Sequence, residues 1–368
     1  MSVGRALRAG IRAVRGTLVR ARTRSWQPRS RLFVLGESLG WALDDEAAFV
    51  ADAARASGYA VAPAEWARHV RGQALFHTSH FAALDPVWLR SGNALGLSYF
   101  HGRPGTPGFP EFDQAFRALR ANAARIERVQ VTHAEMHELV LTAGVADERI
   151  HRIPIGIELD RFPLVTPTRR AEARAALGLP AEAFVVGSFQ KDGVGWAEGL
   201  EPKTIKGPDV LVAALARIHA DAPELVVLLT GPARGFVRDA LERAGIRHRH
   251  VFLEHRDGLP RAYHALDAYL VASRQEGGPK SILEALATGI PFVSTRAGQV
   301  PELVRDGVNG LLADLEDAET LAAGVLRVRD GTEFRAAGRV TAEETAHERL
   351  VPRWLALLDG FVARSERR

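Results

Sequence analysis

The chain has 368 residues, 46% of them hydrophobic and 25% charged, a composition typical of globular proteins and long enough for two domains with separate cores. It contains no cysteine, which excludes disulfides, thiolate metal sites and cysteine nucleophiles. No run of about 18 apolar residues occurs, so the sequence predicts no transmembrane helix. The formal net charge is +4, and much of the excess positive charge lies at the start of the chain.

Residues 1–29 carry eight arginines and no acidic residue. Apolar residues recur in this arm at helical spacing, at Leu7, Ile11, Val14 and Leu18. Arginines fall on the other side, which predicts a basic amphipathic helix. The arm either binds an anionic membrane surface, as a peripheral protein on the inner face, or packs as an N-terminal arm, and the sequence favours neither. It has no secretory signal pattern and no interleaved aromatic residues, so we expect a cytoplasmic protein that does not bind nucleic acid.

From Arg31 onward, short apolar runs alternate with helical patterns, which favours βαβ units and a parallel sheet. Within a first domain, residues 30–165, the expected strands are Leu32–Leu35, Leu75–Thr78, Leu95–Phe100, Val129–Thr132 and Ile150–Ile155. The expected helices of this domain are Asp45–Ser57, Phe112–Ile126 and Ala134–Ala143. Pro163, Pro167 and the charged residues 168–170 then indicate a linker.

A second set of βα repeats covers residues 166–345. Its expected strands are Phe184–Ser188, Leu225–Thr230, Val251–Glu254, Ala268–Ala272 and Ile290–Ser294, and its expected helices include Asp209–His219, Phe236–Ala244 and Ala262–Leu266. Within residues 346–368, a final helix carries an apolar stripe at Leu350, Trp354, Leu357, Leu358 and Phe361. The sequence therefore predicts an α/β fold with two Rossmann-like, doubly wound domains whose strand ends open into a cleft between them.

The segment Arg274–Gly289 lies between two of these expected strands. Pro279 suits the first turn of a helix and Gly289 suits its C-terminal stop, which predicts strand, glycine-rich turn, helix and strand. The N–H groups of Gly277, Gly278 and the first helical turn would then favour an anion, because the helix dipole adds to their partial positive charge.

Two carboxylates accompany this turn. Glu276 stands before the helix and Glu284 lies eight positions later, inside it, so the two could be roughly 10 Å apart. A nucleoside diphosphate sugar fits this spacing, with the diphosphate on the helix N-terminus, one carboxylate on ribose and the other on the sugar. The alternative is a Gly-Gly turn with two solvated glutamates.

The segment also resembles the E-x7-E signature of the retaining glycosyltransferases of family four, which have the two-domain GT-B fold. The match continues through Gly298–Val304 and Asp306–Leu312, and Ile153–Phe162 resembles the hinge segment of that family. The resemblance implies transfer, with retention, of a sugar from a nucleoside diphosphate sugar to a hydroxyl acceptor. It also implies that the final helix, within residues 346–368, crosses back onto the first domain.

The resemblance assigns roles to residues of the second domain. Glu276 would hold sugar hydroxyls and Glu284 the ribose. The donor diphosphate would lie near Lys206, Lys191, Gly277, Gly278, Pro279, Lys280 and Ser281. Lys206-Gly207 matches the family's Lys-Gly before a helix, but no arginine occupies the family's arginine position, where Lys191 is the nearest cation and Lys203 a rival. No Asp-x-Asp occurs, so we predict that no metal or other cofactor is needed and that activity persists in EDTA.

The first domain is less recognisable. His101 ends an expected strand, where side chains of open α/β sheets face the ligand, and the resemblance implies contact with the donor sugar. His77 and His80 would line the acceptor side. Gly36 and Gly40 lie in a loop that faces the donor phosphates in the family, although the glycine pattern is weak.

Several functions remain open. The acceptor could be a cell-envelope glycan, a glycolipid or a small molecule, and the donor base and sugar are not specified by the sequence. The same fold also serves nucleotide-sugar epimerases and pyridoxal-phosphate phosphorylases. A non-catalytic protein that binds a nucleotide sugar or a membrane is a further alternative.

Overall fold

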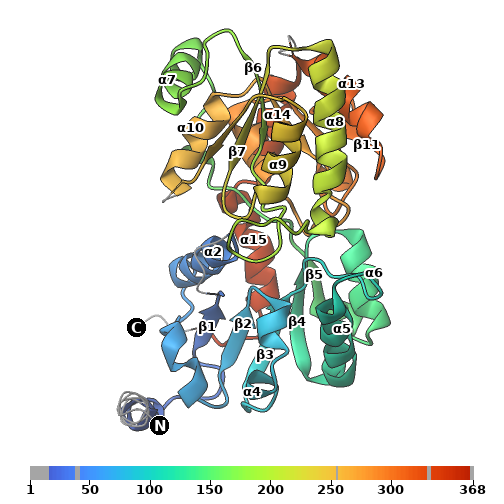
Figure 1. Cartoon of the computed structure of the whole chain (residues 1–368). Coiled ribbons are helices and arrows are strands. Elements are labelled where there is room, and N and C mark those ends of the chain that lie inside the picture. The colour runs from blue at the N-terminus through green and yellow to red at the C-terminus, as the bar shows by residue number, and fades with distance from the viewer. Residues whose placement is uncertain (1–15, 38–41, 254–255, 330–332, 365–368) are drawn as a thin grey trace, which may run out of the picture. The chain divides into compact units, whose positions relative to one another are not determined.

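The computed structural model describes residues 16–37, 42–253, 256–329 and 333–364. The chain divides into two compact units, one formed by residues 1–153 together with 350–368 and the other by residues 154–349 (Figure 1). The division falls after Ile153, at the start of the hinge segment Ile153–Phe162, whereas the sequence predicted a first domain that ends at residue 165. Each unit contains its own parallel sheet, which confirms the predicted α/β class.

The N-terminal unit has a five-stranded parallel sheet whose neighbouring strands follow chain order. The strands are β1 (Leu32–Leu35), β2 (Ala74–His77), β3 (Ala94–Ser98), β4 (Ile126–Val131) and β5 (Ile150–Arg152). One face of this sheet packs against α2 (Ala42–Ala56) and α15 (His347–Leu358), and the other against α5 (Pro110–Asn122) and α6 (Ala134–Thr142). Between β2 and β3 lie the short helices α3 (His80–Ala83) and α4 (Pro86–Leu89).

The apolar stripe of the final helix packs on this first sheet. Its five residues are between 0% and 2% exposed and join the cluster formed by β1, β2 and α2. The Trp354 ring meets the Phe76 ring edge-on, with centroids 5.4 Å apart. The final helix therefore belongs to the core of the N-terminal unit.

The C-terminal unit has a six-stranded parallel sheet in the order β11-β10-β9-β6-β7-β8. The strands are β6 (Phe184–Ser188), β7 (Leu225–Thr230), β8 (His248–Val251), β9 (Ala268–Val271), β10 (Phe292–Thr295) and β11 (Leu311–Ala313). From β6 the chain moves to β7 and β8 on one side, and then to β9, β10 and β11 on the other. The strand order therefore reverses between β6 and β9.

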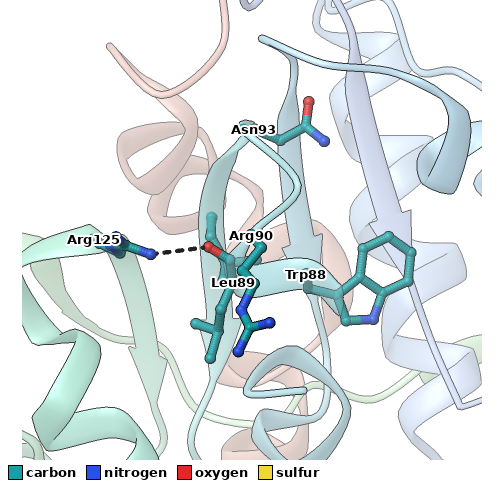
Figure 2. A pocket seen from close by; sticks show the side chains of 7 residues that line it. Trp88, Leu89, Arg90, Asn93 and Arg125 are labelled. Atoms are coloured by element: carbon teal, nitrogen blue, oxygen red, sulfur yellow. Dashed lines mark hydrogen bonds between the residues drawn. The ribbon is translucent and has the colours of Figure 1, made fainter. Parts of the chain in front are cut away.

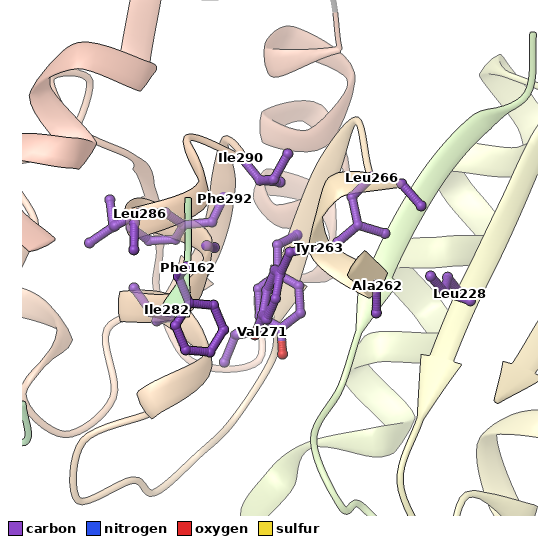
Figure 3. Packing of buried hydrophobic residues seen from close by; sticks show 14 of the residues in the cluster. Phe162, Leu228, Ala262, Tyr263, Leu266, Val271, Ile282, Leu286, Ile290 and Phe292 are labelled. Carbon is purple, nitrogen blue, oxygen red and sulfur yellow. The ribbon is translucent and has the colours of Figure 1, made fainter. Parts of the chain in front are cut away.

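Helices cover both faces of this second sheet. The helices on one face are α7 (Pro167–Leu177), α10 (Leu259–His264), α11 (Lys280–Thr288) and α14 (Glu333–Glu344), and those on the other are α8 (Pro208–Asp221), α9 (Gly235–Arg243) and α13 (Ala318–Val328). Figure 3 shows the first of these layers, in which Tyr263, Phe162 and Ile282 pack together. The buried β strands are apolar on both sides because both sides face helices.

The predicted linker at residues 167–170 is wrong, because helix α7 begins at Pro167. Thr166 caps this helix by accepting a hydrogen bond from the Arg169 N–H at 3.1 Å, and Gly178 ends it with φ of 66°. A proline at the first position and a glycine after the last are ordinary helix boundaries. The charged residues after Pro167 therefore lie within the helix.

Several other boundaries differ from the predictions, among them those of β8, β3 and α11. Strand β8 covers His248–Val251 rather than Val251–Glu254, because an edge strand with polar residues leaves no apolar run in the sequence. Strand β3 ends at Ser98, so His101 follows it by three residues instead of ending it. Helix α11 begins at Lys280, and Pro279 takes the N-cap position.

Only part of the basic arm lies within the described residues, so the stripe at Leu7, Ile11 and Val14 falls outside them. Residues 16–23 are helical, and in this helix Leu18 is 65% exposed whereas Val19 is buried in the first core. In the part of the chain that is described, no helix is long and apolar enough to cross a bilayer.

Candidate functional site

The strand order of the C-terminal unit points to its functional edge. In open α/β sheets, ligands bind outside the carboxyl ends of the strands, where the strand order reverses. Here that place lies between β6 and β9. The loops that follow these two strands carry Gln190 and Lys206 on one side and Ser273 and Glu276 on the other.

Glu276 is the centre of this site. Its side-chain Oε1 accepts hydrogen bonds at 2.7 Å from Lys206 Nζ, from Gln190 Nε2 and from Ser273 Oγ. The residue is only 7% exposed, so its carboxylate depends on these partners in place of water. A charged ammonium and two neutral donors on one oxygen hold the carboxylate in one orientation.

Backbone contacts fix the two loops against each other. The Arg274 and Gln275 N–H groups donate to Ile205 O at 2.9 and 3.0 Å. Gly207 has φ of 60°, and a Cβ there would lie 1.9 Å from Ala272 O. The turn that carries Lys206 can therefore approach the end of β9 only because residue 207 has no side chain.

The Arg274 side chain also joins the loop after β9 to the turn that carries Lys206. Its guanidinium donates to Thr204 O at 2.8 Å, binds both Asp209 carboxylate oxygens and pairs with Glu316. The hydrogen bonds from Arg274 hold the pKa of Asp209 below its ordinary value. These bonds join the β9 loop to the start of α8, and so support the position of Lys206.

Glu284 lies inside α11 and is 3% exposed. The Tyr263 hydroxyl donates to Glu284 Oε2 at 2.9 Å. Burial raises the pKa of Tyr263 well above its usual value, and the nearby Glu284 carboxylate adds to the effect, so the hydroxyl stays protonated and remains a donor. The role of Glu284 toward a ribose stays a prediction.

The remaining residues predicted for the diphosphate lie at the start of α11. Pro279 is the N-cap, and it offers no side-chain oxygen to the N–H groups of the first turn, which begins with Lys280 and Ser281. The start of α11 therefore has no capping side chain, and its helix dipole favours negative charge there. Gly277 and Gly278 lie between Glu276 and this helix end.

Lys191 contacts an aromatic ring, and its role toward the diphosphate stays a prediction. Its ammonium lies over the Trp196 ring, 4.5 Å from the ring centroid, and burial lowers its pKa. The residue before it, Gln190, contacts Glu276 instead. Sequence reasoning missed Gln190 and Ser273, since a neutral polar residue after a strand has no pattern that marks it.

The segment after Lys191 is fixed by a buried ion pair. Arg234 Nη2 lies 2.9 Å from Asp192 Oδ2, and the two side chains are 0% and 2% exposed. Arg234 also donates to Ser188 O at 2.6 Å and to Thr230 O at 3.1 Å. This arginine therefore ties the ends of β6 and β7 to the segment between Gln190 and Lys206.

The N-terminal unit holds the other predicted residues. His101 is half-buried, and its ring lies 5.7 Å from the Phe112 ring and 6.2 Å from those of His80 and Phe81. Burial, and then the charge of His101, lowers the pKa of His80, so its imidazole is neutral at pH 7. The role of His101 toward a donor sugar stays a prediction.

Gly36 follows β1, and a Cβ there would lie 2.2 Å from Asp44 Oδ1. A side chain here would displace the Asp44 carboxylate and lie 3.3 Å from the Asp44 Cα, so the approach of α2 favours a glycine at this position. Gly40 lies outside the described residues. His264, on α10, is 7% exposed, and its Nε2 lies 2.8 Å from Pro163 O.

One hollow lies away from these residues. It has a volume of about 540 Å³ and is lined by Trp88, Leu89, Arg90, Gly92, Asn93, Leu95 and Arg125 (Figure 2). These residues lie at the amino ends of β3 and β4, opposite the edge at which ligands of parallel sheets bind. Among the described residues, no group of three or more histidines and carboxylates could hold a metal ion.

Comparison with known proteins relates this part of the chain to a family. Residues 192–330 match the family described as Glycosyl transferases group 1. This part of the chain is similar to the group 1 glycosyltransferases. The matched range contains Lys206, Glu276 and Glu284, so the site between β6 and β9 lies within the part of the chain that matches this family.

Curated relatives agree with this family. The D-inositol 3-phosphate glycosyltransferase of Saccharomonospora viridis is 34% identical over 218 residues, which cover 56% of this chain and 48% of the relative. That of Geodermatophilus obscurus is 33% identical over 258 residues, which cover 64% of this chain and 54% of the relative. The chain therefore spans about half the length of these curated relatives.

Solved structures share the fold. The Anabaena protein Alr3699/HepE, in complex with UDP and glucose, is 18% identical with a TM-score of 0.70, over 90% of this chain and 99% of that chain. Sucrose-phosphate synthase from Thermosynechococcus elongatus is 18% identical with a TM-score of 0.62, over 91% of this chain and 96% of that chain. These similarities confirm the predicted GT-B fold of two Rossmann-like domains.

Proposed function

We propose that the chain transfers a sugar from a nucleoside diphosphate sugar to a hydroxyl group of an acceptor, and that the donor binds at the β6/β9 edge. The observation that carries this proposal is the Glu276–Lys206 pair beside the start of α11. A carboxylate suits sugar hydroxyls, whereas an ammonium and a helix N-terminus suit a diphosphate. The group that suits the sugar and a group that suits the diphosphate are therefore hydrogen-bonded to each other.

In this proposal Glu276 binds sugar hydroxyls and stabilises positive charge at the anomeric carbon. Lys206, which donates a hydrogen bond to Glu276, stabilises the negative charge that develops on the departing diphosphate. In sites closed to water, such preorganised electrostatic contacts contribute several kcal/mol. Glu284 holds the ribose.

Retention follows from attack on the same face that the diphosphate leaves. The bond between the anomeric carbon and the phosphate oxygen breaks, and the bond to the acceptor oxygen forms. The leaving phosphate oxygen takes the acceptor proton, so no separate protein base is required. Lys206 and the start of α11 replace a metal ion as the counter-charge, and we therefore expect the initial rate to be unchanged in EDTA.

The donor is tested by thermal shift with UDP, GDP, ADP and their sugars. We expect one nucleotide to raise the melting temperature of the wild type and to lose that effect with Glu284→Ala. Glu319→Ala, an exposed glutamate of α13, serves as the matched control. If no nucleotide shifts the wild type, the proposed function is wrong, whereas a shift retained in Glu284→Ala removes only the ribose role.

The acceptor is tested by product formation. Relatives of this chain are named D-inositol 3-phosphate glycosyltransferases, so D-inositol 3-phosphate is the first acceptor to test, followed by glycans and glycolipids. Proton NMR of the product reports whether the anomeric configuration of the donor is retained. The same spectrum recorded without acceptor detects an epimerised donor, which would favour the epimerase alternative.

We also propose peripheral contact with an anionic membrane through the basic arm, which would suit a glycolipid or cell-envelope acceptor. The exposed Leu18 supports this, but Val19 is buried and Trp26 stacks on Trp66 at 6.2 Å. A truncation must therefore stop before this packed part. We expect a chain without residues 1–15 to lose co-sedimentation with anionic vesicles, and unchanged binding would exclude the arm as the contact.

A further inference from the structure

The turn at residues 297–299 packs directly on the turn that carries Glu276. Gly298 has φ of 61°, and a Cβ there would lie 2.3 Å from Glu276 O. The Gln299 N–H donates to Gly277 O at 3.2 Å. The loop after β10 therefore packs against the backbone of the turn that leads into α11.

The Gln299 side chain fills the space next to Gly278. A Cβ at Gly278 would lie 2.5 Å from Gln299 Cδ and 2.9 Å from Gln299 Nε2. The amide therefore lies against the backbone of Gly278, and Gln299 as a whole is 1% exposed. A side chain at position 278 would therefore displace the Gln299 amide.

The orientation of the amide is determined by its partner. The Ile155 N–H donates to Gln299 Oε1 at 3.1 Å. A backbone N–H can only donate, so the oxygen must face Ile155 and the NH₂ group must face away from it. That NH₂ group is buried and has no hydrogen-bond partner within the described chain.

Buried polar groups of native proteins nearly always have a hydrogen-bond partner. Since the Gln299 amide is held in place through its oxygen, its NH₂ group indicates an acceptor from outside the chain. Gln299 Nε2 lies at the Gly277–Gly278 turn, where α11 begins without a side-chain cap. The acceptor that belongs at such a helix start is an anionic or hydroxyl oxygen.

We propose that Gln299 binds the donor directly, by donating a hydrogen bond from Nε2 to an oxygen of its diphosphate or of its sugar. This inference rests on the proposed function and adds a donor ligand from the loop after β10. The bond would join a buried amide to a phosphate oxygen or a sugar hydroxyl. Its loss would leave the amide unpaired in the complex, and we therefore expect donor affinity to fall by about 10-fold or more.

The sharpest test is Gln299→Glu. This variant keeps an oxygen for the Ile155 N–H and replaces only the donating NH₂ by an oxygen that repels a phosphate. Gln73→Glu is the matched control, because Gln73 is also buried, accepts from the Arg31 N–H and donates to Gln27 O, but belongs to the N-terminal unit. Calorimetry measures the affinity of each variant for the nucleotide that binds the wild type and for its glucose ester.

We expect Gln299→Glu to lose about 10-fold or more in affinity while Gln73→Glu binds as the wild type does. Loss for both nucleotide and ester assigns a phosphate oxygen, and loss for the ester alone assigns a sugar hydroxyl. If Gln299→Glu does not fold, Gln299→Met removes the donor without adding charge and should weaken binding in the same direction.

Wild-type affinity for both ligands in a folded Gln299 variant would overturn the inference and leave a water molecule as the partner of Nε2. Equal weakening by Gln73→Glu would also overturn it, because the effect would then reflect general destabilisation. A wild type that binds no nucleotide would refute the proposed function itself, and this outcome is visible before any variant is made.

Discussion

Replacing Arg234 with methionine would remove the buried cation that fixes the segment between β6 and α8. The guanidinium lies 3.0 Å from Asp192 Oδ1 and 2.9 Å from Asp192 Oδ2, and it donates to two strand-end carbonyls. Both side chains of the pair are almost fully buried. The variant would therefore leave a carboxylate in the interior with no counter-charge.

The expected cost follows from these contacts. Breaking a buried ion pair on one side costs about 3–5 kcal/mol, and the orphaned carbonyls add about 1 kcal/mol. For a unit of this size we expect the melting temperature to fall by about 10 °C or more. Burial already raises the pKa of Asp192, and Arg234 opposes that rise. Without Arg234 the pKa rises further, so the variant should become less stable as the pH rises through it.

Urea unfolding of the C-terminal unit measures this loss, with Arg217→Met, on the exposed face of α8, as the control. Asp192→Asn completes a double-mutant cycle, in which we expect a coupling energy of about 2 kcal/mol or more. The variant should also weaken donor binding, because Gln190, two residues before Asp192, contacts Glu276. A coupling energy near zero, or equal stability at pH 5 and pH 8, would refute the reasoning.

Three further predictions concern charge and protonation. Lys206→Met should lower kcat/KM by about 100-fold because it removes the counter-charge of the leaving group, and a rate within threefold of the wild type would contradict this. Tyr263→Phe should cost about 1–3 kcal/mol in urea unfolding, because Glu284 loses its buried donor, and an unchanged midpoint would argue against that role. Burial lowers the pKa of His77 to about 3, so its neutral form stabilises the fold above pH 6.5 and this stability is lost as the pH falls. Between pH 7 and pH 5 the loss should be about 2 kcal/mol, and His77→Leu should abolish it.

Burial explains why the sequence predicted the exact bounds of some strands and misplaced others. β1, β6 and β7 have the predicted bounds because helices cover both faces of each sheet and the strands are continuous apolar runs. β8 lies at the edge of its sheet and reads His248-Arg249-His250-Val251, so hydrophobicity did not mark it. Burial, rather than intrinsic strand preference, determined what the sequence could reveal.

The site was only partly visible for a different reason. Glu276 and Lys206 belong to motifs with distinctive glycines, and the structure brings their side chains together. Gln190 and Ser273 contact the same carboxylate, but each is an ordinary polar residue in a loop. They meet only because β6 and β9 are neighbours in the sheet, although two strands, β7 and β8, come between them in the chain. Such contacts follow from topology, which local patterns do not contain.

The glycines of this edge serve the packing of loops as much as the approach of a ligand. At Gly207 a Cβ would meet Ala272 O, at Gly298 it would meet Glu276 O, and at Gly278 it would meet the Gln299 amide. In all three places the backbone or side chain of one loop at this edge of the sheet packs directly against another loop. From the sequence, an anion site alone explains the glycine-rich turn. The glycines of this edge also allow the loops after β6, β9 and β10 to pack closely together. This packing places an ammonium, a carboxylate and a buried amide beside the same helix start.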